Sequence, residues 1–450
     1  MRVRKLRSSR SPETPVEFEM RIDRLDIRNF RCFAERTFSF NPKFTLLVGS
    51  NASGKTAILE VLTVALGAAL IPVPDAPTRP IHRRDVRRTY RPMGETGHFV
   101  EHYPARIEAS GSLDGKEFKW VRALRTAKSR TTRGETRSIR KAMETLVQQA
   151  RDDDTVVLPY LGYYGTGRLW QEQRRNPGGS VEPGGPLTRY GGYRNCLKPG
   201  SSVRNLIAWI KRLAFIQTQR RNRLETLRSV YEVIARCVEN AVASEFNFDE
   251  DDLVVEFDNR LRVPFRLLSD GQRNMAATVA DIAMRCSQLN PHLNERAHLL
   301  TPGIVLIDEL DLHLHPRWQR DVAKSLCESF PRLQFVATSH SPFIVQSVSP
   351  GGVINLDKET DAPETPSEQS IEDVAENIMG VAQPQRSKRF QDMVDAAERY
   401  FRVIESSEEE EDPQVVQGLR EQLDELEEPF ADNPAYVAFL RLQRTARNLR

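Results

Sequence analysis

The alternation of apolar and polar residues predicts the first elements of the chain. Residues 20–30 alternate with a period of two, which is typical of a half-buried strand, and a shorter strand is predicted at 36–41. The segment 44–48 reads FTLLV and is apolar on both faces, as expected of a strand inside a covered sheet. It runs directly into a Gly-rich turn, and an apolar helix is predicted at 57–70.

The middle of the chain reads as an insertion. Two alternating segments within 106–122 flank the pair Asp114-Gly115, a strong signal for a two-residue hairpin, and they predict an added antiparallel layer. Residues 176–200 are rich in Gly and Pro and predict a loop. Residues 206–242 follow a helical pattern.

The C-terminal half supplies further core strands. A second hairpin is predicted from 253–257 and 261–265, followed by a helix at 271–289. Two apolar strands, 303–307 and 334–338, are separated by a helix, which is the pattern of a parallel sheet. Because the strand before the Gly-rich turn fits the same pattern, we expect a sheet that is assembled from both ends of the chain.

These elements predict an α/β fold in five parts. Beyond the last core strand, a polar linker leads to helices whose apolar residues recur every three or four positions. The expected boundaries are 1–19 for a flexible basic tail, 20–75 for an N-terminal lobe, 76–250 for the insertion, 251–357 for a C-terminal lobe, and 358–450 for the linker and helical C-terminal region.

Composition places the chain of 450 residues among globular proteins. Hydrophobic residues make up 39% and charged residues 28%, which sets fibrous and wholly disordered classes aside. No uninterrupted apolar run reaches the roughly 18 residues of a membrane-spanning helix, and residues 1–10 lack the apolar segment of a secretory signal. We therefore expect a cytoplasmic protein with no membrane partner. Five widely spaced cysteines favour reduced thiols over a zinc site or disulfides.

The net charge of +3 does not demand a nucleic-acid partner, but the distribution of charge changes this picture. Arginines are dense at 79–91, further basic residues follow at 122–141, and an acidic run occupies 408–412. The basic clusters could bind the phosphate backbone of DNA or RNA, and the alternative is a solvated arginine surface. The acidic run and the C-terminal helices favour docking of a protein, with a solvated tail as the alternative.

The segment GSNASGKT matches the phosphate-binding pattern GxxxxGK[ST]. Its glycines let backbone amides face a phosphate, and the positive end of the following helix adds to the attraction. The Lys55 ammonium would reach the outer phosphates, and the Thr56 hydroxyl would bind Mg²⁺. The candidate binding residues are Gly49, Ser50, Asn51, Ala52, Ser53, Gly54, Lys55 and Thr56.

A hydrolytic site also needs an acid that holds the metal and a base that orients water. The segment GIVLIDEL ends with Asp308, which would hold Mg²⁺ through water, and Glu309, which would polarise the attacking water. FVATSHSPF places His340 after the next strand, within reach of a γ-phosphate. A lone histidine is more often structural, but its position relative to Asp308 favours a catalytic role.

The segment LLSDGQRNM creates a second candidate anion site. It places Ser269, Gly271 and Gln272 at the amino end of a predicted helix. One subunit has a single γ-phosphate and does not need two such helix ends. We therefore expect these residues to cover a nucleotide that is bound by a second copy of the chain.

The order of these motifs resembles the ATP-binding-cassette ATPases, in the soluble branch of chromosome-maintenance (SMC), RecF-type and OLD-type proteins. The segments IDELDLHLHPRWQ and ATSHSPF are similar to the OLD- and RecF-like members. The resemblance implies an ABC-type P-loop ATPase head with a mixed β-sheet core, an added antiparallel β layer, a helical insertion and a helical C-terminal region. It also implies ATP and Mg²⁺ as cofactors, a head-to-tail homodimer or larger homo-oligomer, and a subunit-contact role for Asp311.

Two details narrow the resemblance. The LSDG form of the signature and YYGTGR at 163–168 look like ATPase subunits of two-component anti-phage systems, of which the Septu ATPase, also found with some retrons, works beside an HNH nuclease. This implies a separate HNH-type nuclease as partner.

The sequence also departs from the family pattern. Asp270 replaces a glycine of the signature LSGGQ, and its carboxylate would repel a nearby phosphate unless it points away or meets a cation. In transporter cassettes a glutamine couples the nucleotide to the membrane partner, and no residue can be placed at that position here. Gln171 and Gln173 lie too late in the sequence, and Asp85 is a weak candidate.

Other classes fit less well. A transporter ATPase is disfavoured because roughly 210 residues separate Thr56 from Leu268, and the same interval excludes very long coiled-coil arms. An OLD-type nuclease is disfavoured because only about a hundred residues follow Ile344, with no Asp-x-Asp pair for two-metal chemistry. Two alternatives stay open: a RecF-like repair ATPase that binds DNA directly, and a scaffold that ATP stabilises with little turnover.

Overall fold

The computed structural model describes residues 19–93, 96–167, 188–199, 203–221, 223–358 and 366–381, together with single positions and a short segment between 392 and 425. The chain divides into two compact units, 1–371 and 372–450. All predicted site residues lie in the first unit. Outside the described residues lie the basic tail, most of the Gly/Pro-rich loop, Arg168, Gln171 and Gln173, the acidic run, and most of the C-terminal helices.

A five-stranded parallel sheet forms the core of the first unit. Its strand order is β14-β3-β13-β12-β8, and each neighbouring pair is parallel. The apolar runs predict three of these strands, all of whose residues are buried, and the sheet is assembled from both ends of the chain as predicted. The strands are β3 (Phe44–Val48), β8 (Tyr160–Tyr164), β12 (Gly303–Ile307), β13 (Leu333–Thr338) and β14 (Val353–Asn355).

A second sheet confirms the predicted antiparallel layer. Its order is β2-β1-β6-β7, with antiparallel pairing throughout. The chain turns from β6 to β7 at Asp114 and Gly115, whose φ angles of 54° and 69° are the left-handed pair that a tight hairpin turn requires. The strands are β1 (Met20–Phe30), β2 (Phe33–Ser39), β6 (Ala105–Leu113) and β7 (Lys116–Leu124).

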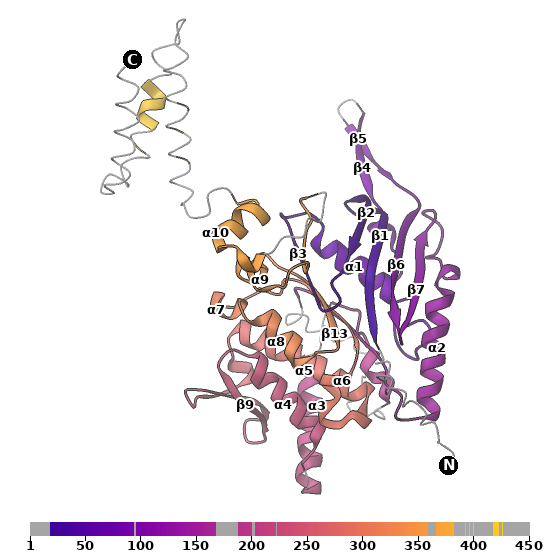
Figure 1. The fold of residues 1–450 in the computed structure, drawn as a ribbon, viewed down its shortest axis with the longest axis vertical. Coiled ribbons are helices and arrows are strands. Elements are labelled where there is room, and N and C mark those ends of the chain that lie inside the picture. Colours follow the sequence, from indigo (N-terminus) through magenta and orange to yellow (C-terminus); the bar gives the residue numbers. More distant parts are fainter. Residues whose placement is uncertain are drawn as a thin grey trace, which may run out of the picture. The chain divides into compact units, whose positions relative to one another are not determined.

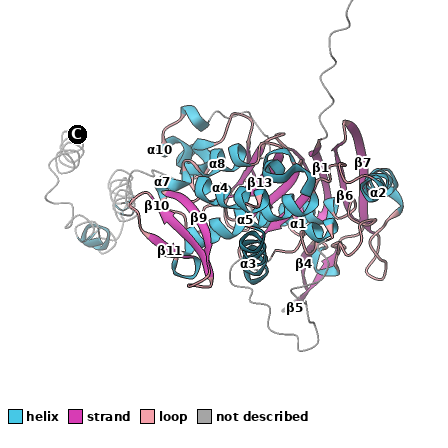
Figure 2. Ribbon diagram, turned by 90° about the horizontal axis from the view of Figure 1, so that it is seen from below, coloured by secondary structure: helices cyan, strands magenta, loops and turns pink. Residues whose placement is uncertain are grey.

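Helix α1 (Lys55–Leu66) lies between the two sheets, as Figure 2 shows. The carbonyl oxygens at the end of a helix have no partner within it. Here Trp120 Nε1 donates to Ala65 O at 3.0 Å, and the Arg122 guanidinium donates to Val64 O at 3.2 Å. Burial lowers the pKa of Arg122 to about 10. Arg122 therefore caps a helix and does not belong to the basic surface expected at 122–141.

Further helices pack around α5 (Asp270–Leu289), which contacts β8, α3 and α4. Beside α4 lies a three-stranded antiparallel sheet of β9 (Ala241–Asn247), β10 (Asp252–Phe257) and β11 (Arg262–Pro264). The other α-helices in the described part of the first unit are α2 (Arg137–Asp152), α3 (Val203–Arg220), α4 (Glu225–Cys237), α6 (Ala297–Leu300), α7 (Pro316–Gln319), α8 (Val322–Ser329) and α9 (Pro342–Ser347), and α10 (Ile371–Asp373) spans the boundary between the two units. Within the described part of the chain, no helix is both long enough and apolar enough to cross a bilayer.

The structure corrects two expectations about the insertion. Residues 206–242 are not helical throughout, because β9 begins at Ala241 and pairs with β10. The predicted hairpin of β10 and β11 therefore has a third strand. The sequence also leaves a second hairpin unpredicted, formed by β4 (Arg88–Met93) and β5 (Thr96–Glu101), which projects from the first unit in Figure 1.

A close approach at the start of β12 gives a test of the core sheet. Gly303 has a φ of 156°, and a Cβ there would lie 1.9 Å from the Tyr160 carbonyl oxygen. Gly303→Ala should force β12 and β8 apart and lower the free energy of unfolding by about 1–3 kcal/mol. Urea unfolding followed by circular dichroism measures this change. Gly134→Ala is the control, because nothing lies within 4 Å of a Cβ at Gly134; equal stability of both variants would contradict this packing.

Candidate nucleotide site

The loop between β3 and α1 curls as the phosphate-binding pattern predicts. Gly49 and Gly54 have φ angles of 148° and 104°, in the region that favours glycine. A Cβ at Gly54 would lie 2.5 Å from the Phe33 ring and 2.7 Å from Cys32 Sγ. The turn between β1 and β2 thus supports the loop from outside, and α1 starts at Lys55 with its amino end at the loop.

Lys55 lies folded against its own loop. Its Nζ donates to the carbonyl oxygens of Gly49 at 2.7 Å and Ser50 at 2.9 Å, and the residue is buried. Burial lowers the pKa of the Lys55 ammonium, and nearby carboxylates, led by Asp357 and then Asp308, partly offset this effect. A bound phosphate would supply the negative charge that favours the ammonium form.

Thr56, Asp308 and Thr338 form one hydrogen-bonded group. The Thr56 hydroxyl donates to the Asp308 carboxylate, with oxygen distances of 3.0 and 3.2 Å. The Thr338 hydroxyl donates to Asp308 Oδ1 at 2.7 Å and accepts from the Glu309 amide at 2.7 Å. Asp308 is 2% exposed. Thr338 is thus a positioning residue that the sequence reasoning did not single out, although it ends the predicted strand.

Glu309 and His340 lie at the same edge of the sheet. Glu309 has a φ of 49°, which is uncommon for a residue with a side chain. The His340 amide donates to Asp311 Oδ1 at 3.2 Å. Because β12 and β13 are parallel neighbours, their carboxyl ends bring the two predicted catalytic residues and Asp308 together.

Asp357 is a contact of the loop that sequence reasoning misses. Its carboxylate accepts from the Ser50 amide at 2.6 Å and from the Ser50 hydroxyl at 2.9 Å. Arg36 on β2 holds the same segment by donating to the carbonyl oxygens of Leu356 and Lys358, each at 2.6 Å. The segment that leaves β14 is therefore tied both to the nucleotide loop and to the antiparallel sheet.

Ser269 caps α5 in the way that its sequence predicts. Its Oγ accepts from the Gln272 amide at 3.3 Å, and the Gln272 side chain accepts from the Ser269 amide at 3.2 Å. The Asp270 carboxylate forms an ion pair with Arg273 at 2.5 Å. The carboxylate that replaces a glycine of LSGGQ thus pairs with a cation of its own helix, and this pairing reduces its repulsion of a phosphate.

Gly271 has a structural reason within a single chain. A Cβ there would lie 2.2 Å from the His313 carbonyl oxygen, so the first turn of α5 packs on the segment after β12. A glycine is needed at this contact whether or not a second copy is present. The contact of Ser269, Gly271 and Gln272 with a partner's nucleotide stays a prediction.

The described residues fit a triphosphate with Mg²⁺. Ser53 Oγ is buried in the loop and has no hydrogen-bond partner. A hydroxyl in that position is costly unless a ligand pairs with it. Lys55, Ser53 and the loop amides could hold the phosphates, and the oxygen atoms of Thr56 and Asp308 are the ligand type that Mg²⁺ prefers.

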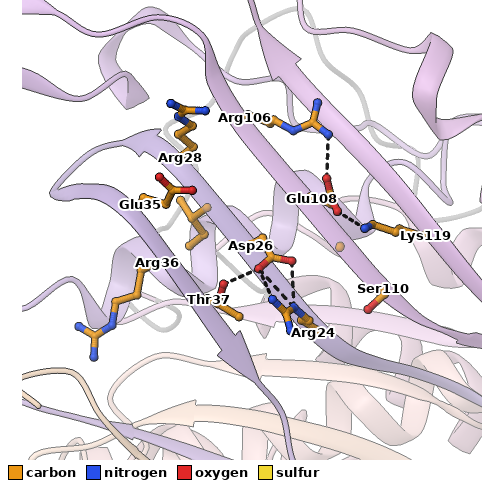
Figure 3. A pocket seen from close by; sticks show the side chains of 12 residues that line it. Arg24, Asp26, Arg28, Glu35, Arg36, Thr37, Arg106, Glu108, Ser110 and Lys119 are labelled. Atoms are coloured by element: carbon orange, nitrogen blue, oxygen red, sulfur yellow. Dashed lines mark hydrogen bonds and ion pairs between the residues drawn. The ribbon is translucent and has the colours of Figure 1, made fainter. Parts of the chain in front are cut away.

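A separate cavity of about 390 Å³ lies on the outer face of the antiparallel sheet, as Figure 3 shows. It is lined by residues of β1, β2, β6 and β7, and none of the predicted site residues is among them. Its charges are largely paired: Arg24 contacts Asp26 at 3.0 Å, and Glu108 contacts Arg106 at 2.7 Å as well as Lys119. This pairing makes the cavity a poor phosphate site.

The fold and the site define an ABC-type P-loop ATPase head. A family model described as "AAA domain" matches residues 24–237, and another, "AAA domain, putative AbiEii toxin, Type IV TA system", matches residues 198–346. The chain is similar to AAA ATPases, among them the Septu and retron ATPases.

Several relatives show this similarity. The chain is 46% identical over 82 residues to "Retron Vc95 probable ATPase" of Vibrio cholerae serotype O1 biovar El Tor, which is 18% of this chain and 16% of the relative. It is 39% identical over 89 residues to "Septu protein PtuA" of Bacillus mycoides (strain KBAB4), which is 20% of this chain and 12% of the relative. The matches thus span less than a fifth of these relatives. The SMC head domain from Thermotoga maritima aligns with a TM-score of 0.39 at 14% identity, over 74% of this chain and 93% of that one.

The Thr338 hydroxyl gives a test of the site geometry. Thr338→Val keeps the shape of the side chain but removes the hydrogen bonds to Asp308 and Glu309. We expect the Mg²⁺ concentration needed for half-maximal nucleotide binding to rise about 10- to 100-fold, the usual cost of losing a partner of a metal ligand. Binding of a fluorescent ATP analogue, titrated with Mg²⁺, measures this. Thr338→Ser should stay near wild type; equal affinities of all three proteins would show that Thr338 does not position Asp308.

Proposed function

We propose that this chain binds ATP with Mg²⁺ and hydrolyses it. The observation that carries the proposal is the group of Thr56, Asp308 and Thr338 at the amino end of α1, with Glu309 directly beside it. P-loop nucleotide hydrolases use this combination, in which a loop hydroxyl and a carboxylate at a strand end share one metal. The matches to AAA-domain models and to ATPases support the same reading.

Each residue of the site would have one task. Lys55 and the loop amides would orient the outer phosphates, and bound Mg²⁺ would offset their negative charge. Glu309 would accept a proton from the water that attacks the γ-phosphorus. The bond from phosphorus to the ADP oxygen then breaks, and ADP and phosphate are the products. His340 would donate a hydrogen bond to the γ-phosphate during this step.

We propose that Ser269, Gly271 and Gln272 of one subunit cover the nucleotide that is bound by the other subunit of a head-to-tail dimer. Ser269 is exposed at the amino end of a helix of 20 residues, where the helix dipole favours an anion. Two residues earlier, Leu267 is 68% exposed, and a second subunit would remove this apolar side chain from water. The ion pair between Asp270 and Arg273 leaves this helix end able to face a phosphate.

Mixing two inactive variants tests whether sites are shared. Lys55→Ala removes the phosphate contact of a chain's own loop, and Ser269→Arg fills the space over a partner's nucleotide. Each variant alone should hydrolyse ATP at least about 100-fold more slowly than wild type. An equimolar mixture forms heterodimers with one intact site, so it should recover up to about a quarter of the wild-type rate if the subunits pair at random in dimers.

Release of phosphate measures both the single variants and the mixture. A mixture that stays as slow as its components, although light scattering shows that they associate, would argue against sites shared between chains. A wild-type chain without ATP turnover would instead contradict the proposed hydrolysis and favour the ATP-stabilised scaffold.

We further propose that ATP-driven dimerisation regulates a separate effector, an HNH-type nuclease of bacterial anti-phage defence. The similarity to Septu and retron ATPases supports this role. A nucleic-acid contact through the basic cluster at 79–91 belongs to the same proposal. The position of Glu309 beside Asp308 favours a turning-over regulator rather than a passive scaffold.

Glu309→Gln tests the effector and the dimer together. This variant keeps the groups that bind Mg²⁺ and ATP but lacks the base, so the ATP-bound dimer should accumulate. Size-exclusion chromatography with light scattering measures the association state, and mass spectrometry identifies proteins that co-purify from the native gene neighbourhood. Glu328→Gln on the exposed face of α8 is the control. An unchanged association state would contradict the ATP-driven dimer. A purified dimer without any nuclease would contradict the nuclease effector.

A further inference from the structure

The hairpin of β4 and β5 is here called the arm, and among the described residues its hydrogen bonds to the rest of the first unit lie at its base. The Arg87 amide donates to Asn29 O at 3.0 Å, and the His102 amide donates to Arg87 O at 2.9 Å. Beyond this base the two strands pair with each other, with Tyr90 opposite Phe99 and Arg91 opposite His98. Figures 1 and 2 both show the arm at the edge of the first unit. Most residues of both strands are exposed, so within the described part of the chain both faces of the arm are open to a ligand.

Two aromatic rings lie exposed on one face of the arm. Tyr90 is 55% exposed and Phe99 is 67% exposed, with their ring centroids 5.5 Å apart and their planes at 65°. The Tyr90 ring lies over Gly97, because a Cβ at Gly97 would be 2.1 Å from that ring. Aromatic rings of this size usually avoid water, so a pair displayed on a projecting hairpin indicates a binding surface.

The exposed charge of the arm and its base is mainly positive. Arg83 and Arg88 share Glu101 at 2.9 and 3.0 Å, so this carboxylate is already neutralised. Asp85 is fully buried and pairs with Arg31 and Arg79 inside the protein.

Arg84 and Arg91 are exposed, and no ion pair holds either of them within the described residues. Arg91 follows Tyr90 in β4, so its side chain leaves the opposite face of the arm, where it can meet phosphates of a strand that passes around the edge of the hairpin. The sequence adds one further acid, Glu95, between Met93 and Thr96. The arm thus combines flat apolar rings with cations, and the combination suits a ligand with bases and phosphates.

We propose that the arm binds single-stranded nucleic acid, with bases stacked on Tyr90 and Phe99 and phosphates paired with Arg84 and Arg91. The two rings favour a single strand over a duplex, because the bases of a duplex already stack on one another. The excess of arginine over exposed carboxylates favours a polyanion over a protein surface. The inference rests on the nucleic-acid contact of the proposed function and specifies its ligand and its residues, and it does not depend on ATP hydrolysis.

The test measures fluorescence anisotropy of a labelled oligodeoxythymidine, an oligouridine of equal length and a DNA duplex, with the full chain free of nucleotide. Tyr90→Ala combined with Phe99→Ala should weaken binding of both single strands at least about tenfold, since each stacked base adds roughly 1–3 kcal/mol. Arg84→Gln combined with Arg91→Gln should reduce the slope of the logarithm of the binding constant against the logarithm of the salt concentration by about 1.4. This is the value expected when two phosphates of a single strand lose their contacts.

Phe248→Ala is the matched control. Phe248 is 48% exposed and forms a similar edge-to-face pair with Phe246 at 5.2 Å, but its neighbours Asp249 and Glu250 are acidic. Its replacement should leave the affinity unchanged. Circular dichroism shows that each variant is folded.

Three results would overturn the inference. The first is equal affinity of arm variants and wild type for the single strands. The second is tighter binding of the duplex that is unchanged when Tyr90 and Phe99 are replaced. The third is loss of a co-purifying nuclease in arm variants that still bind the oligonucleotides. The last result would make the arm a protein-docking element. ATP hydrolysis without nucleic acid should be unchanged in the arm variants. Absence of hydrolysis in wild type that still binds the oligonucleotides would count against the proposed ATPase and not against the arm.

Discussion

The buried carboxylate of Asp308 unites two parts of the chain that lie 252 residues apart. It accepts one hydroxyl from α1 and another from β13, and a carboxylate that is 2% exposed is tolerable only with such partners. These groups meet because β3, β13 and β12 are consecutive in the sheet. The site therefore exists only after both lobes have assembled, and neither lobe alone contains it.

Local patterns suffice for the parts of the fold and site that lie at strand ends. The runs FTLLV and GIVLI are short and apolar and contain β-branched residues, which favours buried strands, and each is followed by residues with a distinct chemistry. The loop at 49–56 and the acids after β12 could therefore be placed correctly. The parallel pairing of β12 with β13 then follows from the helices between them.

Other features depend on tertiary packing and have no local signature. YLGYY at 160–164 is a short apolar run, and periodicity does not distinguish such a run in a strand from one in a helix. The contact between Asp357 and Ser50 joins residues 307 apart, and the contact of Gly271 with His313 depends on two loops that meet. The buried role of Arg122 is equally invisible in a cluster of basic residues.

Helix α1 is about 18 Å long and is gripped at both ends. Its first residues belong to the nucleotide loop, and near its other end the Trp120 indole and the Arg122 guanidinium of β7 donate hydrogen bonds to the carbonyl oxygens of Ala65 and Val64. Strand β7 pairs with β6, β6 pairs with β1, and Asn29 of β1 accepts the Arg87 amide at the base of the arm. An unbroken series of hydrogen-bonded elements therefore joins the end of α1 to the base of the arm.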